Sequence, residues 1–257
     1  MTFRFVLAAL AGAAWLTAGP AFAQSGPQSS APVAGHSFSP GQRAEIIEIV
    51  REALKTDPSI LRDAVAALQA DEATQKDAAA SAAIAQAGPV LTHAPGDPVA
   101  GNPNGDVTVV EFYDLRCPYC RRMEPVMTEL LRRDRKIRLV FKDIPILGPG
   151  SVLGARAVLA AQKQGGYQKL HDLIMAGPST ITEDSLKADA VRAGLDWARL
   201  RRDMDDPAIQ RRIDDNLDLA HALGIEGTPA YVIGAKLIPG AAELADLQDA
   251  VKAARTP

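Results

Sequence analysis

The sequence predicts an α/β fold with a helical insertion, preceded by an α-helical N-terminal segment. Two runs rich in β-branched and aromatic residues, VTVVEFYD at 107–114 and IRLVFKDI at 137–144, are typical of buried strands. A helical pattern, PYCRRMEPVMTELLRRD, lies between them at 118–134. Strand, helix and strand in this order favour a right-handed crossover onto a parallel sheet.

The first 23 residues are typical of a secretory signal peptide. Arg4 supplies the positive n-region, residues 5–18 are almost wholly apolar, and Ala-Phe-Ala at 21–23 matches a cleavage site. The apolar run is shorter than the roughly 20 residues that span a bilayer. We therefore expect cleavage rather than an uncleaved membrane anchor. The arginine- and alanine-rich composition favours a bacterial protein, and hence export to the periplasm.

Length and composition set the limits for the rest of the chain. The protein has 257 residues with a formal net charge of -3, which excludes the basic footprint of a nucleic-acid-binding protein. Its hydrophobic content of 47% and charged content of 23% are ordinary for a globular protein. We expect one main domain with an appendage and no nucleic-acid partner.

The appendage precedes the main domain. Residues 24–41 are rich in Ser, Pro, Gly and Ala, which predicts a flexible tether. Residues 42–87 carry two helical patterns, the second capped by Asp57 with Pro58 in its first turn, and Gly88 ends it. Their apolar stripes are narrow, so they pack either on the main domain or on other copies of themselves. We favour self-association, as a trimer.

The main domain covers residues 88–257 and contains a helical insert at about 150–224. No internal repeat is visible in it. A turn near Gly234-Ala235 separates a last pair of strands. The expected insert helices cover 151–164, 167–175, 182–194 and 206–224, the strands cover 229–233 and 235–239, and the closing helix covers 241–254.

Both cysteines of the chain, Cys117 and Cys120, lie in the motif CPYC. A structural disulfide between them would close only a short loop and stabilise the fold by about 1.9 kcal/mol, against about 3 kcal/mol for a fifteen-residue loop. The pair is therefore poorly placed for a structural role. Structural zinc needs four ligands, and the four histidines are scattered along the chain, so no metal site is predicted. Two thiolates suit a soft Cu(I) ion, and copper binding stays open as a side role.

A redox centre explains the pair best. Cys117 follows the first strand and Pro118 begins a helix, so the Cys117 sulfur lies at a helix N-terminus, where the helix dipole favours an anion. Cys117 is therefore the expected nucleophile. Cys120, one turn into the helix, is the expected resolving thiol, which releases the mixed disulfide that Cys117 forms with a substrate.

Two charged residues interrupt the predicted strands. Glu111 lies in the first strand, where a lone buried carboxylate is costly. It is either an edge residue that faces water or a proton acceptor for Cys120. Lys142, in the second strand, is either a surface lysine or the partner of Glu111. Near the last strands, Thr228-Pro229 is a site for a cis peptide, although trans-proline at the start of a strand is commoner.

The motifs EFYDLRCPYC and GTPAYVIG and the helical insert together resemble the thioredoxin-like DsbA family of exported thiol–disulfide oxidoreductases, over residues 88–257. Gly101-Asn102-Pro103 is similar to a short motif before the first central strand of that family. Glutaredoxins share the Pro-Tyr pair, but their CxxC motif and their cis-proline lie closer together in sequence. The helical segment at 42–87, with its TDPSIL turn, resembles the suppressor-of-copper-sensitivity (ScsC-like) branch.

This resemblance implies roles for individual residues. Pro229 is expected to be cis and to face Cys117, and Thr228 to bind a substrate peptide through its backbone. Glu111 is the expected buried carboxylate. Lys142, Pro118 and Tyr119 are expected to support the site, and no cofactor is expected.

The function expected from these observations is that of a periplasmic dithiol–disulfide oxidoreductase. Its expected partners are exported proteins with cysteines and a membrane redox partner. An oligomer favours an isomerase or reductase over an oxidase. Three alternatives stay open: a copper-binding or copper-tolerance protein that uses the same thiols, a monomeric dithiol oxidase, and a binding module in which CxxC is only structural.

Overall fold

A computed structural model describes residues 38–256 of the chain. The expected signal peptide at 1–23 and most of the expected tether lie outside this range. The chain divides into two compact units between Leu61 and Arg62, and each is described separately below. No helix among the described residues has the length and apolar character that a membrane span requires.

The first unit contains helix α1, Pro40–Thr56, and the beginning of α2, Ser59–Thr92. The Ser39 side chain caps α1 and the Gln42 side chain bonds back to the Ser39 N–H, so the helix begins two residues before the expected start of the helical segment at 42. Asp57 Oδ1 accepts from the Ser59 N–H at 3.0 Å, as expected for a cap of the second helix. No residue of α1 is buried.

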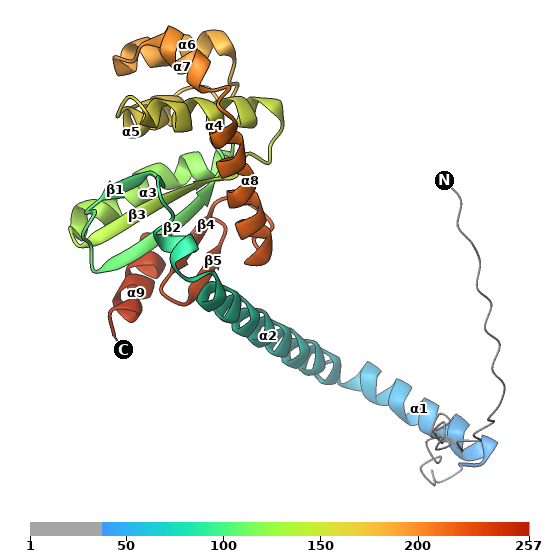
Figure 1. Cartoon of the computed structure of the whole chain (residues 1–257). Coiled ribbons are helices and arrows are strands. Elements are labelled where there is room, and N and C mark those ends of the chain that lie inside the picture. The colour runs from blue at the N-terminus through green and yellow to red at the C-terminus, as the bar shows by residue number, and fades with distance from the viewer. Residues whose placement is uncertain (1–37, 257) are drawn as a thin grey trace, which may run out of the picture. The chain divides into compact units, whose positions relative to one another are not determined.

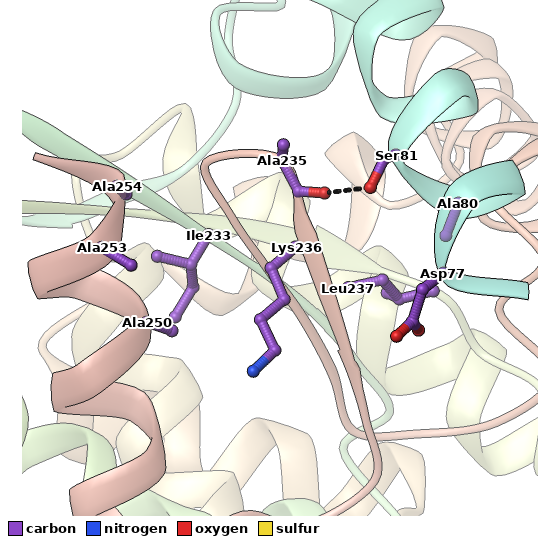
Figure 2. A pocket seen from close by; sticks show the side chains of 10 residues that line it. All are labelled: Asp77, Ala80, Ser81, Ile233, Ala235, Lys236, Leu237, Ala250, Ala253 and Ala254. Carbon is purple, nitrogen blue, oxygen red and sulfur yellow. Dashed lines mark hydrogen bonds between the residues drawn. The ribbon is translucent and has the colours of Figure 1, made fainter. Parts of the chain in front are cut away.

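The later part of α2 belongs to the second unit. Ile84 and Leu91 are buried in its core, and Ser81 Oγ donates to the Ala235 carbonyl at 3.0 Å, beside a pocket of about 390 Å³ (Figure 2). Gly88, at φ 49° and ψ −131°, breaks the helix where its end was expected, and a final turn follows. The structure thus divides the chain earlier than residue 88, because the last turns of α2 pack on the sheet.

The second unit is built around one five-stranded sheet of order β1-β3-β2-β4-β5 (Figure 1). Strands β2 and β3 are parallel and helix α3 connects them, so the expected crossover between parallel strands is confirmed. The other neighbouring pairs are antiparallel. The bounds are β1 Val99–Gly101, β2 Val107–Tyr113, α3 Pro118–Arg133, β3 Ile137–Asp143, β4 Ala230–Ile233, β5 Lys236–Pro239 and α9 Leu244–Ala254.

Each face of the sheet has its own core. Val109 and Tyr113 of β2 lie on the face that α3 and α9 cover, together with buried side chains of the helical insert. Val110 and Phe112 lie on the opposite face, with Ile84 of α2 and buried residues of α8. Side chains alternate along a strand, so the parity of a residue in β2 decides which core it joins.

The helical insert follows β3, and its first four helices gather at one end of the unit (Figure 1). The helices are α4 Pro149–Gln162, α5 Tyr167–Ala176, α6 Glu183–Ala193, α7 Trp197–Asp203 and α8 Pro207–Ala222. The caps expected at Thr182 and Asp206 are present. The sequence did not predict α7 or β1, because seven and three residues are too short for a periodic pattern.

Candidate functional site

The cysteine pair lies at the start of α3, as expected. Cys117 is the N-cap residue, with extended backbone angles, and Pro118 is the first residue of the helix. Proline is well suited to this position because the first N–H of a helix has no internal partner. Both thiols are buried, but Cys117 keeps a 4% exposed edge whereas Cys120 is fully buried. Both thiols are free, which is the reduced state of the pair.

The cis-proline loop packs directly against this pair. The Thr228–Pro229 peptide bond is cis, which confirms that expectation. Cys117 Sγ donates to the Thr228 carbonyl at 3.2 Å, so the loop faces the Cys117 thiol. The Gly240 N–H donates to the Pro229 carbonyl at 2.8 Å and holds the loop beside β5. A backbone segment with polar groups therefore lies beside the Cys117 sulfur.

Glu111 is buried in the centre of the sheet. It lies on β2, between β3 and β4, and is 2% exposed, so the edge position is wrong. By parity it lies on the α3 side, with Val109 and Tyr113. Tyr231 Oη donates to its Oε1 at 3.2 Å. Burial, and then the charge of Glu124, raise the pKa of Glu111 to about 8, while His171 and Tyr231 oppose this.

Burial also raises the pKa of Cys120 strongly, and the nearby Cys117 and Glu111 raise it further. A hydrogen bond involving the Asp114 backbone acts in the opposite direction. Cys120 is therefore a protonated thiol at neutral pH. It needs a nearby proton acceptor before it can act as a nucleophile.

Lys142 does not pair with Glu111, so that expectation is wrong. In the parallel register Lys142 lies opposite Phe112, on the other face of the sheet from Glu111. Its Nζ lies 2.7 Å from Asp97 Oδ2 and donates to the Val90 carbonyl at 3.1 Å. Asp97 also binds Arg212 of α8 at 3.0 Å. Lys142 thus anchors the chain before β1 to the sheet and to the insert.

The rim of the site is partly apolar. Tyr119, between the cysteines, is 52% exposed, and the Arg122 guanidinium lies 4.2 Å from its ring centroid. Ile146 and Leu147, in the loop after β3, are also exposed. Asp114 holds that loop close to the cysteines, because its Oδ2 accepts from the Ile146 and Leu147 N–H groups at 2.9 and 3.0 Å.

Sequence reasoning missed the role of Asp114. This buried carboxylate also accepts from the Arg116 N–H and from Ser151 Oγ, both at 2.8 Å, and its carbonyl accepts from the Cys117 N–H at 3.0 Å. It therefore fixes the turn that delivers Cys117 to the helix start. An acidic residue directly after a buried strand was the available signal.

Two arginines that flank the cysteines connect α3 to the insert. Arg116 Nε donates to the Ser179 carbonyl at 3.1 Å, and Arg121 Nη1 donates to the Met175 and Gly177 carbonyls at 2.9 and 2.6 Å. Both side chains thus bind the end of α5 and the chain that follows it.

A second charged group lies beside the redox pair. Glu124, one turn after Cys120, lies near His171 of α5, whose ring nitrogens face Glu124 at 3.7 Å and Asp172 at 3.2 Å. Among the described residues these three make the one set of close metal-ligand side chains. The two carboxylates face opposite nitrogens of one ring, so they do not converge on a single ion.

A thiol at a helix start, a second, buried thiol one turn later and a facing cis-proline are the features of a thiol–disulfide oxidoreductase of the thioredoxin-like fold. Residues 108–252 match the DSBA-like thioredoxin domain, and residues 42–75 match the copper resistance protein ScsC N-terminal domain. The chain belongs to the DsbA-like thioredoxin family, and its N-terminal segment is ScsC-like.

Individual relatives agree with this assignment. A thioredoxin-like oxidoreductase from Silicibacter pomeroyi is 44% identical, with a TM-score of 0.65 over 66% of this chain and 98% of that one. ScsC from Proteus mirabilis, in a transitional conformation, is 27% identical, with a TM-score of 0.62 over 85% and 97% of the two chains.

A longer relative matches only in part. The Na(+)/H(+) antiporter NhaA 3 of Salinispora tropica is 32% identical over 160 residues, which are 62% of this chain and 24% of the antiporter. The chain thus spans about a quarter of the length of that curated relative.

Proposed function

We propose that this protein is a periplasmic oxidoreductase that exchanges disulfides with exported proteins, with an emphasis on reduction or isomerisation. The observation that carries the proposal is the position of Cys117 at the start of α3, with its sulfur 3.2 Å from the carbonyl before cis-Pro229. Extended peptides bind well beside such a segment, because its backbone groups at Thr228 can pair with theirs. The signal-like residues 1–23 support export.

The proposed reaction has two steps. The Cys117 thiolate attacks a substrate disulfide, forms a mixed disulfide and releases one substrate sulfur as a thiolate. Cys120 then passes its proton to the Glu111 carboxylate and attacks Cys117 Sγ. This forms the Cys117–Cys120 disulfide and releases the second substrate thiolate, so the substrate gains the two electrons that the protein loses. In isomerisation a second substrate thiol attacks before Cys120 does.

A scrambled-disulfide substrate tests the proposal directly. We expect the reduced protein to restore the activity of a scrambled secreted enzyme, and Cys117→Ser to abolish this. Cys120→Ser should accumulate the mixed disulfide, since the resolving thiol is missing. Reshuffling that survives in Cys117→Ser would rule out the proposed nucleophile. A redox titration against glutathione then establishes the preferred direction of electron flow.

We propose that residues 42–87 assemble the chain into an oligomer, with a trimer as the expected state. The support is a row of exposed apolar side chains on α1 and on the start of α2, in a helix without buried residues. An oligomer raises the effective concentration of thiols around one bound substrate, which favours isomerisation. The exposed side chains are Ile46, Ile47, Ile49, Val50, Leu54, Ile60, Leu61, Val65 and Leu68.

Light scattering on the chain without residues 1–23 tests this assembly. We expect an oligomer that becomes a monomer in the double variant Ile47→Glu, Val50→Glu, while the exposed Lys55→Glu on the same helix stays oligomeric. A truncated variant should begin at Arg62 rather than at Gly88, because Ile84 belongs to the core of the second unit. A monomeric parent protein contradicts the proposal.

Copper handling is the second candidate function, favoured by the ScsC N-terminal match at 42–75. The same two thiols would hold Cu(I), and binding would have to displace the proton of buried Cys120. Tight stoichiometric Cu(I) binding without disulfide exchange would make this the primary function. Exchange activity with weak copper binding would exclude it.

A further inference from the structure

We propose that His171 of the helical insert is a positioning residue of the redox centre. As an imidazolium it acts with Glu124 to set the charge of buried Glu111, and thereby the pH at which Cys120 releases its proton. This inference rests on the proposed function, in which Glu111 accepts that proton. It gives the insert a part in the chemistry of the cysteine pair.

His171 is fully buried in an aromatic environment. Its ring lies 5.1 Å from the rings of Tyr113 and Phe141 and stacks on Tyr167 at 6.0 Å, measured between centroids. These contacts come from β2, β3 and α5, so they fix the direction of the ring. A ring held in this way keeps its two nitrogens aimed at fixed points.

Both nitrogens face a carboxylate. Nδ1 lies 3.2 Å from Asp172 Oδ1, and Nε2 lies 3.7 Å from Glu124 Oε1. Nε2 is buried and makes no hydrogen bond with any described residue. Only the imidazolium carries an N–H on both nitrogens, so two facing carboxylates select the charged form. Burial alone would lower the pKa of His171, but Asp172, Glu124 and Glu111 together raise it.

The link to the thiols runs through α3 and β2. Glu124 is four residues after Cys120, and side chains at this spacing lie next to each other on a helix. Tyr113, which contacts His171, is two residues after Glu111 on the same face of β2. The negative charge of Glu124 raises the pKa of Glu111, and the positive charge of His171 lowers it. The two neighbours therefore act on Glu111 with opposite signs.

Several other titratable groups lie around His171. The pKa of Asp143 is raised to about 6 by burial, against its hydrogen bond with Tyr113. Burial raises the pKa of Glu124, and the charge of Arg121 opposes this. The titratable groups that act on His171 or are acted on by it are Glu111 and Tyr113 on β2, Glu124 on α3, Asp143 on β3, and Tyr167 and Asp172 on α5.

The reaction of the reduced protein with 5,5′-dithiobis(2-nitrobenzoate) separates the two thiols. Cys117 attacks first and releases one thionitrobenzoate, and Cys120 then displaces the second one as the internal disulfide forms. The rate of the second phase follows the ionised fraction of Glu111, so it should rise with pH through a midpoint near 8. Stopped-flow traces over a range of pH give this midpoint.

We expect His171→Gln to move the midpoint up by about one pH unit, and Glu124→Gln to move it down by about one unit. Below the midpoint the histidine variant should then be about tenfold slower in the second phase. The matched controls are His221→Gln, an exposed histidine of α8, and Glu129→Gln, farther along α3. Both controls should keep the parent midpoint. Packing damage alone does not produce opposite shifts.

Three results would overturn the inference: unchanged midpoints in both variants, shifts in the same direction, or a neutral His171 ring at pH 7 in the parent protein. The last is read by NMR titration and needs no variant, so it decides the matter even where His171→Gln does not fold. A parent protein with no second phase contradicts the proposed function itself. A second phase whose pH midpoint is the same in the parent protein and in both variants contradicts only the role of His171.

Discussion

Replacing Glu111 with Gln should stabilise the reduced protein at alkaline pH. The ordinary pKa of 4.5 is raised to about 8 in the folded protein, chiefly by burial. The ionised form is therefore disfavoured by folding. A shift of about 3.5 units at about 1.4 kcal/mol each corresponds to a cost on the order of 5 kcal/mol. Gln keeps the shape and an acceptor for Tyr231 without the charge.

The sign of the pH dependence follows from the same shift. Below about pH 4.5 the carboxyl is protonated in both the folded and the unfolded chain, so the two proteins should have nearly equal stability. As pH rises towards 8, the unfolded chain releases this proton first, and the parent protein alone loses stability. Above about pH 8 the difference should be constant.

Urea unfolding under reducing conditions at a series of pH values measures this difference. Ionisable groups that do not interact with Glu111 titrate alike in both proteins, so their contributions cancel in the comparison. Glu72→Gln, an exposed residue of α2, is the matched control and should show no such trend. A Glu111→Gln effect that is the same at pH 5 and pH 8 would refute the assignment of a buried, neutral carboxyl.

Three further outcomes follow from the structure. Lys142→Met should lower the free energy of unfolding, measured in urea, by about 3–5 kcal/mol, because buried Asp97 then keeps only Arg212 as a charged partner. The same substitution at an exposed lysine should have little effect. Gly105→Ala should lower the stability by about 1–3 kcal/mol, because the added Cβ meets backbone atoms at 2.5 and 2.6 Å; equal stability would contradict this. Tyr231→Phe should move the midpoint of the second thiol phase upward, because it removes a hydrogen bond that lowers the pKa of Glu111, and a downward shift would contradict that sign.

The parts of the site that depend on local sequence could be predicted. The positions of Cys117 and Cys120 at the helix start could be predicted because CPYC directly follows a predicted strand and Pro118 can begin a helix. The burial of Glu111 was expected only through the family resemblance, because the strand pattern alone left an exposed edge position open. Cis-Pro229 was expected only through the family resemblance, because X-Pro bonds are mostly trans.

The parts of the site that depend on strand register and on contacts between distant segments could not be predicted from the sequence. Lys142 and Glu111 lie on adjacent strands, but the offset between the strands places them on opposite faces, and one step of register decides this. The environment of His171 joins β2, β3 and α5, which lie far apart along the chain. A single histidine in a helical pattern carries no sign of such neighbours.

Gly88 shows that handedness, rather than size, can decide which residue fits a join between two helical segments. A Cβ added there would meet no atom within 4 Å, yet φ of 49° with ψ of −131° is a conformation that L-residues avoid. The mirror image of these angles lies in the extended region, which is open to ordinary side chains. A D-amino acid introduced by chemical ligation would therefore fit where L-alanine is strained. The bend before the last turn of α2 is thus encoded by the stereochemistry of one residue and not by a lack of space for a side chain.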